Sequence, residues 1–243
     1  MKKLLLVSFL CLALNVCQAH TDKNISASGP PPQAQASQAQ SPPIICIDPG
    51  HPSETSAGNV VQNETTEVHI AWLVALKLRA LLEAKGIRVV MTKSREDQLV
   101  KNKDRALTAN NANAAVMVRL HCDASADSGF ALYYPDRQGT VDGVTGPGTD
   151  VIERSRKAAE AIHQGMAEIL KDALKDGGVR GDSKTFVGSR QGALTGSIYS
   201  RVPAVTIEMV VLSNKADAEY IKNARGQQQM AEAIAAGIER FVK

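Results

Sequence analysis

The sequence predicts an α/β fold, specifically a three-layer sandwich in which helices cover both faces of a mostly parallel, twisted sheet. Short apolar runs alternate along the chain with longer segments of helical periodicity, which is the order that parallel sheets require. Two of the runs end in a histidine. The carboxyl ends of parallel strands meet at one edge of a sheet, where α/β proteins bind their ligands. We therefore expect the functional site at that edge.

The two histidine-bearing strands are the clearest elements. Residues 44–47 are apolar and lie between Pro42-Pro43 and Asp48-Pro49-Gly50, which predicts a short buried strand that ends just before His51. Residues 114–120 form a second largely apolar run, and His121 follows it directly. If the two strands are neighbours, both imidazoles can reach one metal ion.

The other elements follow from periodicity and from glycine or proline breaks. Residues 177–201 are rich in glycine and serine, show no clear period and could cover a site. In chain order we expect a polar loop over 52–66, a helix that ends at Gly86, a strand over 87–92, a short helix over 101–113, the His121 strand, a strand over 129–134, a glycine-rich loop over 140–149, the longest helix over 151–174, a strand over 202–211 and a closing helix over 216–242, broken near Arg225-Gly226.

The N-terminal residues differ in composition from the rest of the chain. Residues 1–19 have a Lys2-Lys3 start, an apolar middle too short to span a membrane and a small-residue cleavage site, as in a secretory signal. Residues 20–43 are rich in Pro, Gln, Ala and Ser, which predicts a disordered tether. We expect residues 44–243 to form one domain. The protein should be exported to the periplasm, cell wall or medium, without a stable membrane anchor after cleavage.

Charge and composition exclude one class of partner. The formal net charge is +3, and without the two lysines of the signal segment 26 basic residues face 25 acidic ones. Lysine and arginine do not gather on any segment, so nucleic-acid binding is not expected. We expect a monomer.

Two of the four cysteines, Cys46 and Cys122, lie outside the signal segment. An exported compartment permits a disulfide between them. Two buried thiols that pack as small apolar groups are an equally good interpretation. Both cysteines belong to the strands that carry the histidines.

Elimination among the five histidines leaves His51 and His121 as the best metal ligands. His20 lies in the tether segment, and His163 lies within a predicted helix, where a half-exposed structural role is the simpler account. His69 lies in the first turns of another predicted helix and stays a minor candidate. A catalytic zinc usually has three protein ligands. Glu64 and Glu67 lie at the start of a predicted helix and either can be the third, although helix-capping also explains a glutamate there.

Glu208 is the most unusual acidic residue, because it interrupts the apolar run 205–211. A buried carboxylate without a partner is costly. One explanation is catalytic: a glutamate beside a hydrolytic metal takes a proton from the attacking water and later passes it on. The alternative is a buried ion pair with Arg105 or Arg119.

Together these motifs resemble zinc-dependent N-acetylmuramoyl-L-alanine amidases, in the catalytic domain of the cell-separation and spore-wall type. The resemblance covers nearly all of residues 44–243. Its motifs, in family order, are Asp48-Pro49-Gly50-His51, the Glu67 helix, Arg95 with Asp104-Arg105 and Ala109-Asn110, Leu120-His121-Cys122-Asp123-Ala124, and Ile207-Glu208-Met209 with Leu212-Ser213-Asn214.

The resemblance implies a fold, a cofactor and a reaction. It implies an α/β sandwich with one Zn²⁺ held by His51, Glu67 and His121, with Glu67 preferred to Glu64 because its distance to Gly86 fits the family pattern. Glu208 falls on the catalytic glutamate. The implied reaction is hydrolysis of the amide between N-acetylmuramic acid and L-alanine of the stem peptide, so peptidoglycan is the expected partner and cell-wall remodelling or degradation the expected role.

The chain also departs from the family pattern. Pro52-Ser53 replaces the usual Gly-Gly, Arg119-Leu120 replaces Ser-Ile, and Val210-Val211 replaces Gly-Phe. These departures motivate one alternative, a peptidoglycan-binding protein without turnover. Another wall-directed zinc peptidase or deacetylase is a second alternative, because it would use the same metal chemistry.

Overall fold

The computed structural model describes residues 42–55 and 57–243, and these belong to one compact unit. The predicted signal segment and all but the last two residues of the predicted tether lie outside the described residues. Within the described ranges, no helix combines the length and the apolar character that a membrane crossing requires.

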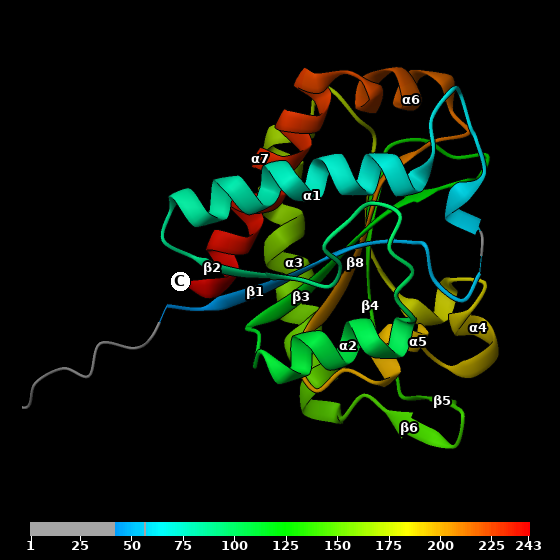
Figure 1. Ribbon diagram of the computed structural model, residues 1–243, viewed down its shortest axis with the longest axis vertical. Helices are drawn as coiled ribbons and strands as arrows, with labels where there is room; N and C mark the ends of the chain where they lie inside the picture. Colours follow the sequence, from blue (N-terminus) through cyan, green and yellow to red (C-terminus); the bar gives the residue numbers. More distant parts are fainter. Residues whose placement is uncertain (1–41, 56) are drawn as a thin grey trace, which may run out of the picture. The chain divides into compact units, whose positions relative to one another are not determined.

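A six-stranded sheet with the order β2-β1-β3-β8-β4-β7 forms the centre of the unit (Figure 1). Every neighbouring pair is parallel except β4 and β8, which run antiparallel. The predicted mostly parallel sheet is therefore confirmed. The strands are β1 (Ile44–Pro49), β2 (Arg88–Met91), β3 (Val116–Asp123), β4 (Phe130–Tyr134), β7 (Asp176–Gly181) and β8 (Ala204–Val211); a separate hairpin consists of β5 (Gly139–Val141) and β6 (Val144–Gly146).

Helices cover both faces of the sheet, which confirms the three-layer sandwich (Figure 1). Helices α1, α3 and α7 pack over the larger core on one face, and α2 and α5 lie against the other. The helices are η1 (Ala57–Asn59), α1 (Glu67–Ala84), α2 (Asn102–Asn111), α3 (Thr149–Leu170), η2 (Asp182–Lys184), α4 (Gly188–Gln191), α5 (Thr195–Ile198), α6 (Lys215–Lys222) and α7 (Ala224–Val242).

Strand alternation separates the core from the site. In β3, Leu120 and Cys122 belong to the larger core, whereas Arg119 and His121 alternate with them and line a cavity on the opposite face. The same β3 strand therefore contributes both to the main core and to the candidate site.

The structure settles the two cysteine interpretations. Cys46 and Cys122 are both buried free thiols. Cys46 packs in the smaller cluster beside α2, and Cys122 packs in the larger core. The sheet separates them, so they behave as small apolar side chains.

Most predicted elements are confirmed within a few residues, and the exceptions have local reasons. The glycine-rich loop contains the β5–β6 hairpin, whose tip has Asp142 and Gly143 at positive φ. The unassigned segment contains β7, a strand with glycines in place of an apolar alternation. The closing helix breaks at Asn223, whose side chain caps α7, rather than at Arg225-Gly226.

Candidate functional site

His51 is held in a tight turn after β1. Its φ is 47°, in the left-handed region that non-glycine residues rarely adopt. Gly58 of η1 packs against its ring, and a Cβ at position 58 would lie 2.3 Å from His51 Cγ. Ser53 Oγ lies 3.5 Å from Nδ1. The chain thus positions this imidazole through one close glycine contact and one hydroxyl.

Arg105, a residue of α2, donates hydrogen bonds to the turn that carries His51. This side chain is fully buried, and its guanidinium donates to the carbonyl oxygens of Pro49 (2.7 Å) and Pro52 (2.8 Å), on either side of His51. Lys93 is also buried and donates to the carbonyl of His51 itself. Three carbonyls of the turn therefore accept hydrogen bonds from buried cations.

Asp48 is the anion that balances part of this charge. Its two carboxylate oxygens accept from Arg105 Nη1 (2.6 Å) and Arg119 Nε (2.9 Å), and Thr92 Oγ1 donates to it as well. Burial alone would raise the pKa of Asp48. The guanidiniums of Arg105 and Arg119 outweigh this effect and hold the pKa of Asp48 well below its usual value. The sequence did not predict this network, because the residues alone suggested Glu208, and not Asp48, as the buried acid that Arg105 or Arg119 would pair with.

His121 lies in β3, beside the turn that carries His51. Gly50 donates its N–H to the carbonyl of Leu120 (2.8 Å), and a Cβ on Gly50 would lie 2.6 Å from His121 Cε1. A glycine at position 50 therefore lets the turn approach the His121 ring. The buried Nε2 of His121 has no hydrogen-bond partner among residues 42–55 and 57–243.

Glu67 joins the two histidines from the first residue of α1. Thr66 caps this helix, with its hydroxyl accepting from the N–H of His69 (3.2 Å). Glu67 Oε1 lies 2.7 Å from His121 Nδ1 and 3.5 Å from His51 Nε2, and the two rings meet edge to face with centroids 5.2 Å apart. These three side chains form the only group of metal-ligand type found in the described residues.

Glu64, the other candidate for the third ligand, is not part of this group. Its side chain is 90% exposed and pairs with Lys222. Geometry therefore favours Glu67, as the family pattern did.

The protonation states of the group suit a metal. Burial lowers the pKa of His51 to about 4, although the charge of Glu67 opposes the shift, so this imidazole is neutral at pH 7. The pKa of Glu67 is lowered, because the hydrogen bond and charge of His121 outweigh the effect of burial. Two imidazoles and a carboxylate, with ligand atoms within 4.8 Å of one another, match the donor set of a catalytic zinc site that has three protein ligands.

Glu208 lies opposite His121 in the register of β3 and β8. Its Oε2 is buried and has no hydrogen-bond partner within the part of the chain that the structure describes. Burial raises the pKa of this carboxyl well above its usual value, and the charges of Glu67 and Asp123 add to the shift. The alternative of an ion pair with Arg105 or Arg119 is wrong, because both arginines pair with Asp48.

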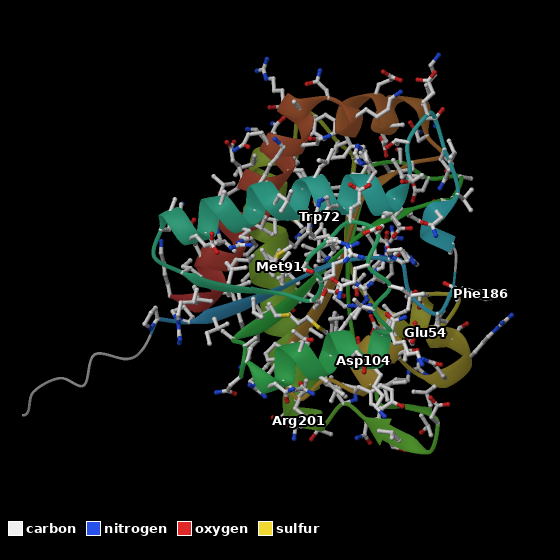
Figure 2. All side chains as sticks on the ribbon, viewed as in Figure 1. Glu54, Trp72, Met91, Asp104, Phe186 and Arg201 are labelled. Carbon is white, nitrogen blue, oxygen red and sulfur yellow. The ribbon has the colours of Figure 1, made fainter. Side chains whose placement is uncertain are left out.

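A cavity of about 690 Å³ opens over these groups. Both polar residues such as Glu54 and apolar residues such as Phe186 line this cavity, and Phe186 is 70% exposed near α4 (Figure 2). The unassigned segment 177–201 thus covers part of the site, as expected. Lining residues outside the His51, Glu67, His121 and Glu208 set include Ser53, Asn102, Arg119, Asp123, Val141, Asp142, Thr185, Val187, Leu194, Thr195 and Thr206.

Fold and site together define an α/β sandwich protein with a candidate single-metal centre and an adjacent acid at the carboxyl edge of its sheet. A family model described as N-acetylmuramoyl-L-alanine amidase matches residues 45–240. The chain belongs to this family.

Curated relatives and solved structures agree with this membership. The chain is 27% identical to N-acetylmuramoyl-L-alanine amidase AmiC of Escherichia coli over 90% of its own length, and it spans 58% of that relative. It is 24% identical to the amidase Rv3717 of Mycobacterium tuberculosis, covering 82% of this chain and 86% of the relative. The catalytic domain of the amidase CwlV from Bacillus (Paenibacillus) polymyxa superposes with a TM-score of 0.63 at 25% identity, covering 81% of this chain and 96% of that one.

Proposed function

We propose that this protein is a zinc-dependent N-acetylmuramoyl-L-alanine amidase, which hydrolyses the amide between the lactyl group of N-acetylmuramic acid and L-alanine of the stem peptide. The observation that carries the proposal is the convergence of His51, Glu67 and His121 with Glu208 inside one cavity. Membership of the amidase family supplies the substrate class.

The chain's own residues account for binding and proton transfer. His51 and His121 present imidazole nitrogens and Glu67 presents a carboxylate oxygen, so these three residues would hold a divalent cation. When bound, zinc polarises a carbonyl and lowers the pKa of water. The positive charge of a bound cation would favour the ionised form of Glu208, whose unpartnered Oε2 would then accept a proton of the attacking water and deliver it to the leaving amine of L-alanine.

The cavity has the chemistry that a glycopeptide requires. Phe186, Val187 and Leu194 form an apolar wall, against which the methyl groups and ring faces of the glycan can pack. Ser53 and Asn102 add hydroxyl and amide groups to the lining of the cavity. A cavity open to solvent also admits a polymer, whereas an enclosed one would not.

The departures from the family pattern leave this machinery intact. Val210 and Val211 lie in the extended backbone of β8 and are buried, a conformation that valine favours. Pro52 supplies a carbonyl to Arg105, and Ser53 lies beside the His51 ring. These contacts support turnover rather than binding alone.

We also propose that the protein acts outside the cytoplasm as a monomer, with residues 1–19 as its export signal and residues 20–43 as a tether. Peptidoglycan, the proposed substrate, lies in that compartment. N-terminal sequencing of the exported protein tests the cleavage site, and sedimentation equilibrium tests the oligomeric state.

The test of the activity is product identification on purified sacculi. The protein should release muropeptide chains with new L-alanine amino termini, identified by mass spectrometry. EDTA should abolish release, and Zn²⁺ should restore it. Release of acetate would indicate a deacetylase, cleavage within the stem would indicate a peptidase, and sacculus binding without any product would indicate a binding protein.

A matched pair of glutamate variants tests the ligand assignment. Glu67→Gln should lose stoichiometric zinc in metal analysis. Glu64→Gln should retain it, because Glu64 is an exposed partner of Lys222. Equal zinc content in both variants would contradict the assignment.

A further inference from the structure

Phe186 is the one aromatic side chain that stands exposed among residues 42–55 and 57–243. It lies near α4 and lines the same cavity as His51, His121 and Glu208 (Figure 2). Val187, the next residue, is also exposed and also lines this cavity. Exposed apolar groups that adjoin a binding cavity mark a surface that a ligand covers. The position of Phe186 therefore points to a contact with the substrate.

The ring of Phe186 has one covered face and one open face. The guanidinium carbon of Arg190 lies 3.7 Å from the ring centroid, so this cation covers one side of the ring. The residue nevertheless remains 70% exposed, which requires that the opposite face is open to solvent. A flat apolar surface of this kind matches the face of a pyranose ring, where C–H groups rather than hydroxyls point outward.

Hydrogen bonds fix the segment that carries Phe186. At its start, the carbonyl of the buried Asp182 accepts from both the N–H (2.9 Å) and the hydroxyl (2.8 Å) of Thr185. The Thr185 hydroxyl in turn accepts from the N–H of Gly188 (2.9 Å). At its end, the Asp182 carboxylate accepts from the N–H of Leu194 (3.1 Å). Because the segment is already ordered, a ligand that packs on Phe186 loses little free energy to ordering it.

The position of Glu208 indicates which part of the substrate reaches Phe186. Glu208 lines the main cavity and also a smaller recess, whose lining includes Asp123, Ser128 and Tyr133. In the proposed reaction Glu208 delivers a proton to the leaving amine of L-alanine, so the stem peptide leaves the reacting centre on the side of this carboxyl. Phe186 lines the main cavity but not the recess. The glycan, on the other side of the scissile amide, is therefore the part that meets Phe186.

We propose that Phe186 stacks on the saccharide next to the reacting N-acetylmuramic acid, so that the protein distinguishes glycan strands from single muropeptides. The inference rests on the proposed amidase function and deepens it. A cavity of about 690 Å³ has the size of a site for one small ligand, so a polymer must continue past its rim, where Phe186 and Val187 lie. Phe186 thus determines specificity, while Glu208 and the three ligand residues perform the reaction.

The decisive experiment compares two substrates that have the same single scissile amide. N-acetylmuramoyl-L-alanyl-D-isoglutamine contains one saccharide, and the matching trisaccharide adds N-acetylglucosamine on both sides of the same unit. With the unaltered protein we expect about a tenfold higher kcat/KM for the trisaccharide, through a lower KM, which is the effect that one aromatic contact supplies. Equal values would overturn the assignment of Phe186 and leave the amidase function standing. Failure to hydrolyse either compound would overturn the amidase function, and the inference with it.

Variants locate the preference. Phe186→Ala should remove it by raising KM for the trisaccharide only, and Phe186→Tyr should retain it because tyrosine keeps the flat ring. Leu99→Ala is the matched control, because Leu99 is a large apolar residue that is 60% exposed and does not line the cavity. A preference that persists in Phe186→Ala would overturn the proposal. An equal loss of kcat/KM on both substrates in this variant would also overturn it, because the contact would then not involve the added saccharides.

Discussion

Glu208 and His121 stand opposite each other in the parallel strands β8 and β3, so a single register brings an acid beside an imidazole. Immediately beyond this pair the register shifts, and Asp123 pairs with Val211. The extra residue in β8 lets both Met209 and Val210 pack in the larger core while Glu208 lines the cavity. The pairing register of β3 and β8 therefore determines where the Glu208 carboxyl lies.

Replacing Glu208 should lower the catalytic rate without lowering the stability of the fold. Glu208→Gln should lower kcat at least about a hundredfold, because the amide cannot accept the proton of water. Since burial raises the pKa of Glu208, a neutral amide should not lower the melting temperature. Muropeptide release and thermal unfolding check the two outcomes. A folded variant with full activity would contradict the proton-transfer role.

Gly58 should be required for the position of His51. In Gly58→Ala the added Cβ meets the imidazole ring, so either the ring or η1 must shift. We expect at least a tenfold loss of zinc affinity, measured by competition with a chelating dye. The control is Gly86→Ala, which has φ +75° but no atom within 4 Å of the new Cβ, and it should lose about 1 kcal/mol of stability with unchanged zinc affinity. Unchanged zinc affinity in Gly58→Ala would refute this role.

Arg105 should stabilise both the fold and the His51 turn. Arg105→Met leaves Asp48 with one guanidinium and removes the donors to Pro49 and Pro52, so we expect a loss of about 3–5 kcal/mol in the free energy of unfolding. Urea denaturation measures this loss. Arg105→Lys keeps the positive charge beside Asp48 but cannot donate to the carbonyls of both Pro49 and Pro52. This variant should therefore lose zinc affinity while its free energy of unfolding falls less than that of Arg105→Met. A loss below about 1 kcal/mol in Arg105→Met would show that the turn is held in another way.

Asp182 should make stability depend on pH. Burial raises its pKa to about 6 in the folded protein, from 3.8. Between these values the folded state retains a proton that the unfolded state has released, so stability should fall as pH rises from about 4 to about 6, by roughly 3 kcal/mol. Asp182→Asn should lack this component. Urea denaturation of both proteins across this range measures the difference, and parallel pH profiles would refute the assignment.

The sequence determined much of the fold because its signals are local. Apolar runs ended by Asp-Pro-Gly or by a histidine, and a helix ended by Gly86, need no distant partner to be recognised. The glycine-containing strand β7 and the β5–β6 hairpin were missed because their strands lack an apolar alternation and depend on neighbours for pairing.

For the site, local sequence was enough to identify the residues that carry chemistry, namely two histidines at strand ends and an acid inside an apolar strand. Their partners became known only from the three-dimensional fold. It placed Glu67 rather than Glu64 beside the histidines, and it assigned Arg105 and Arg119 to Asp48 instead of Glu208. The physical reason is that pairing of buried charges depends on distances between residues far apart in the chain, which strand order and register set and local sequence does not encode.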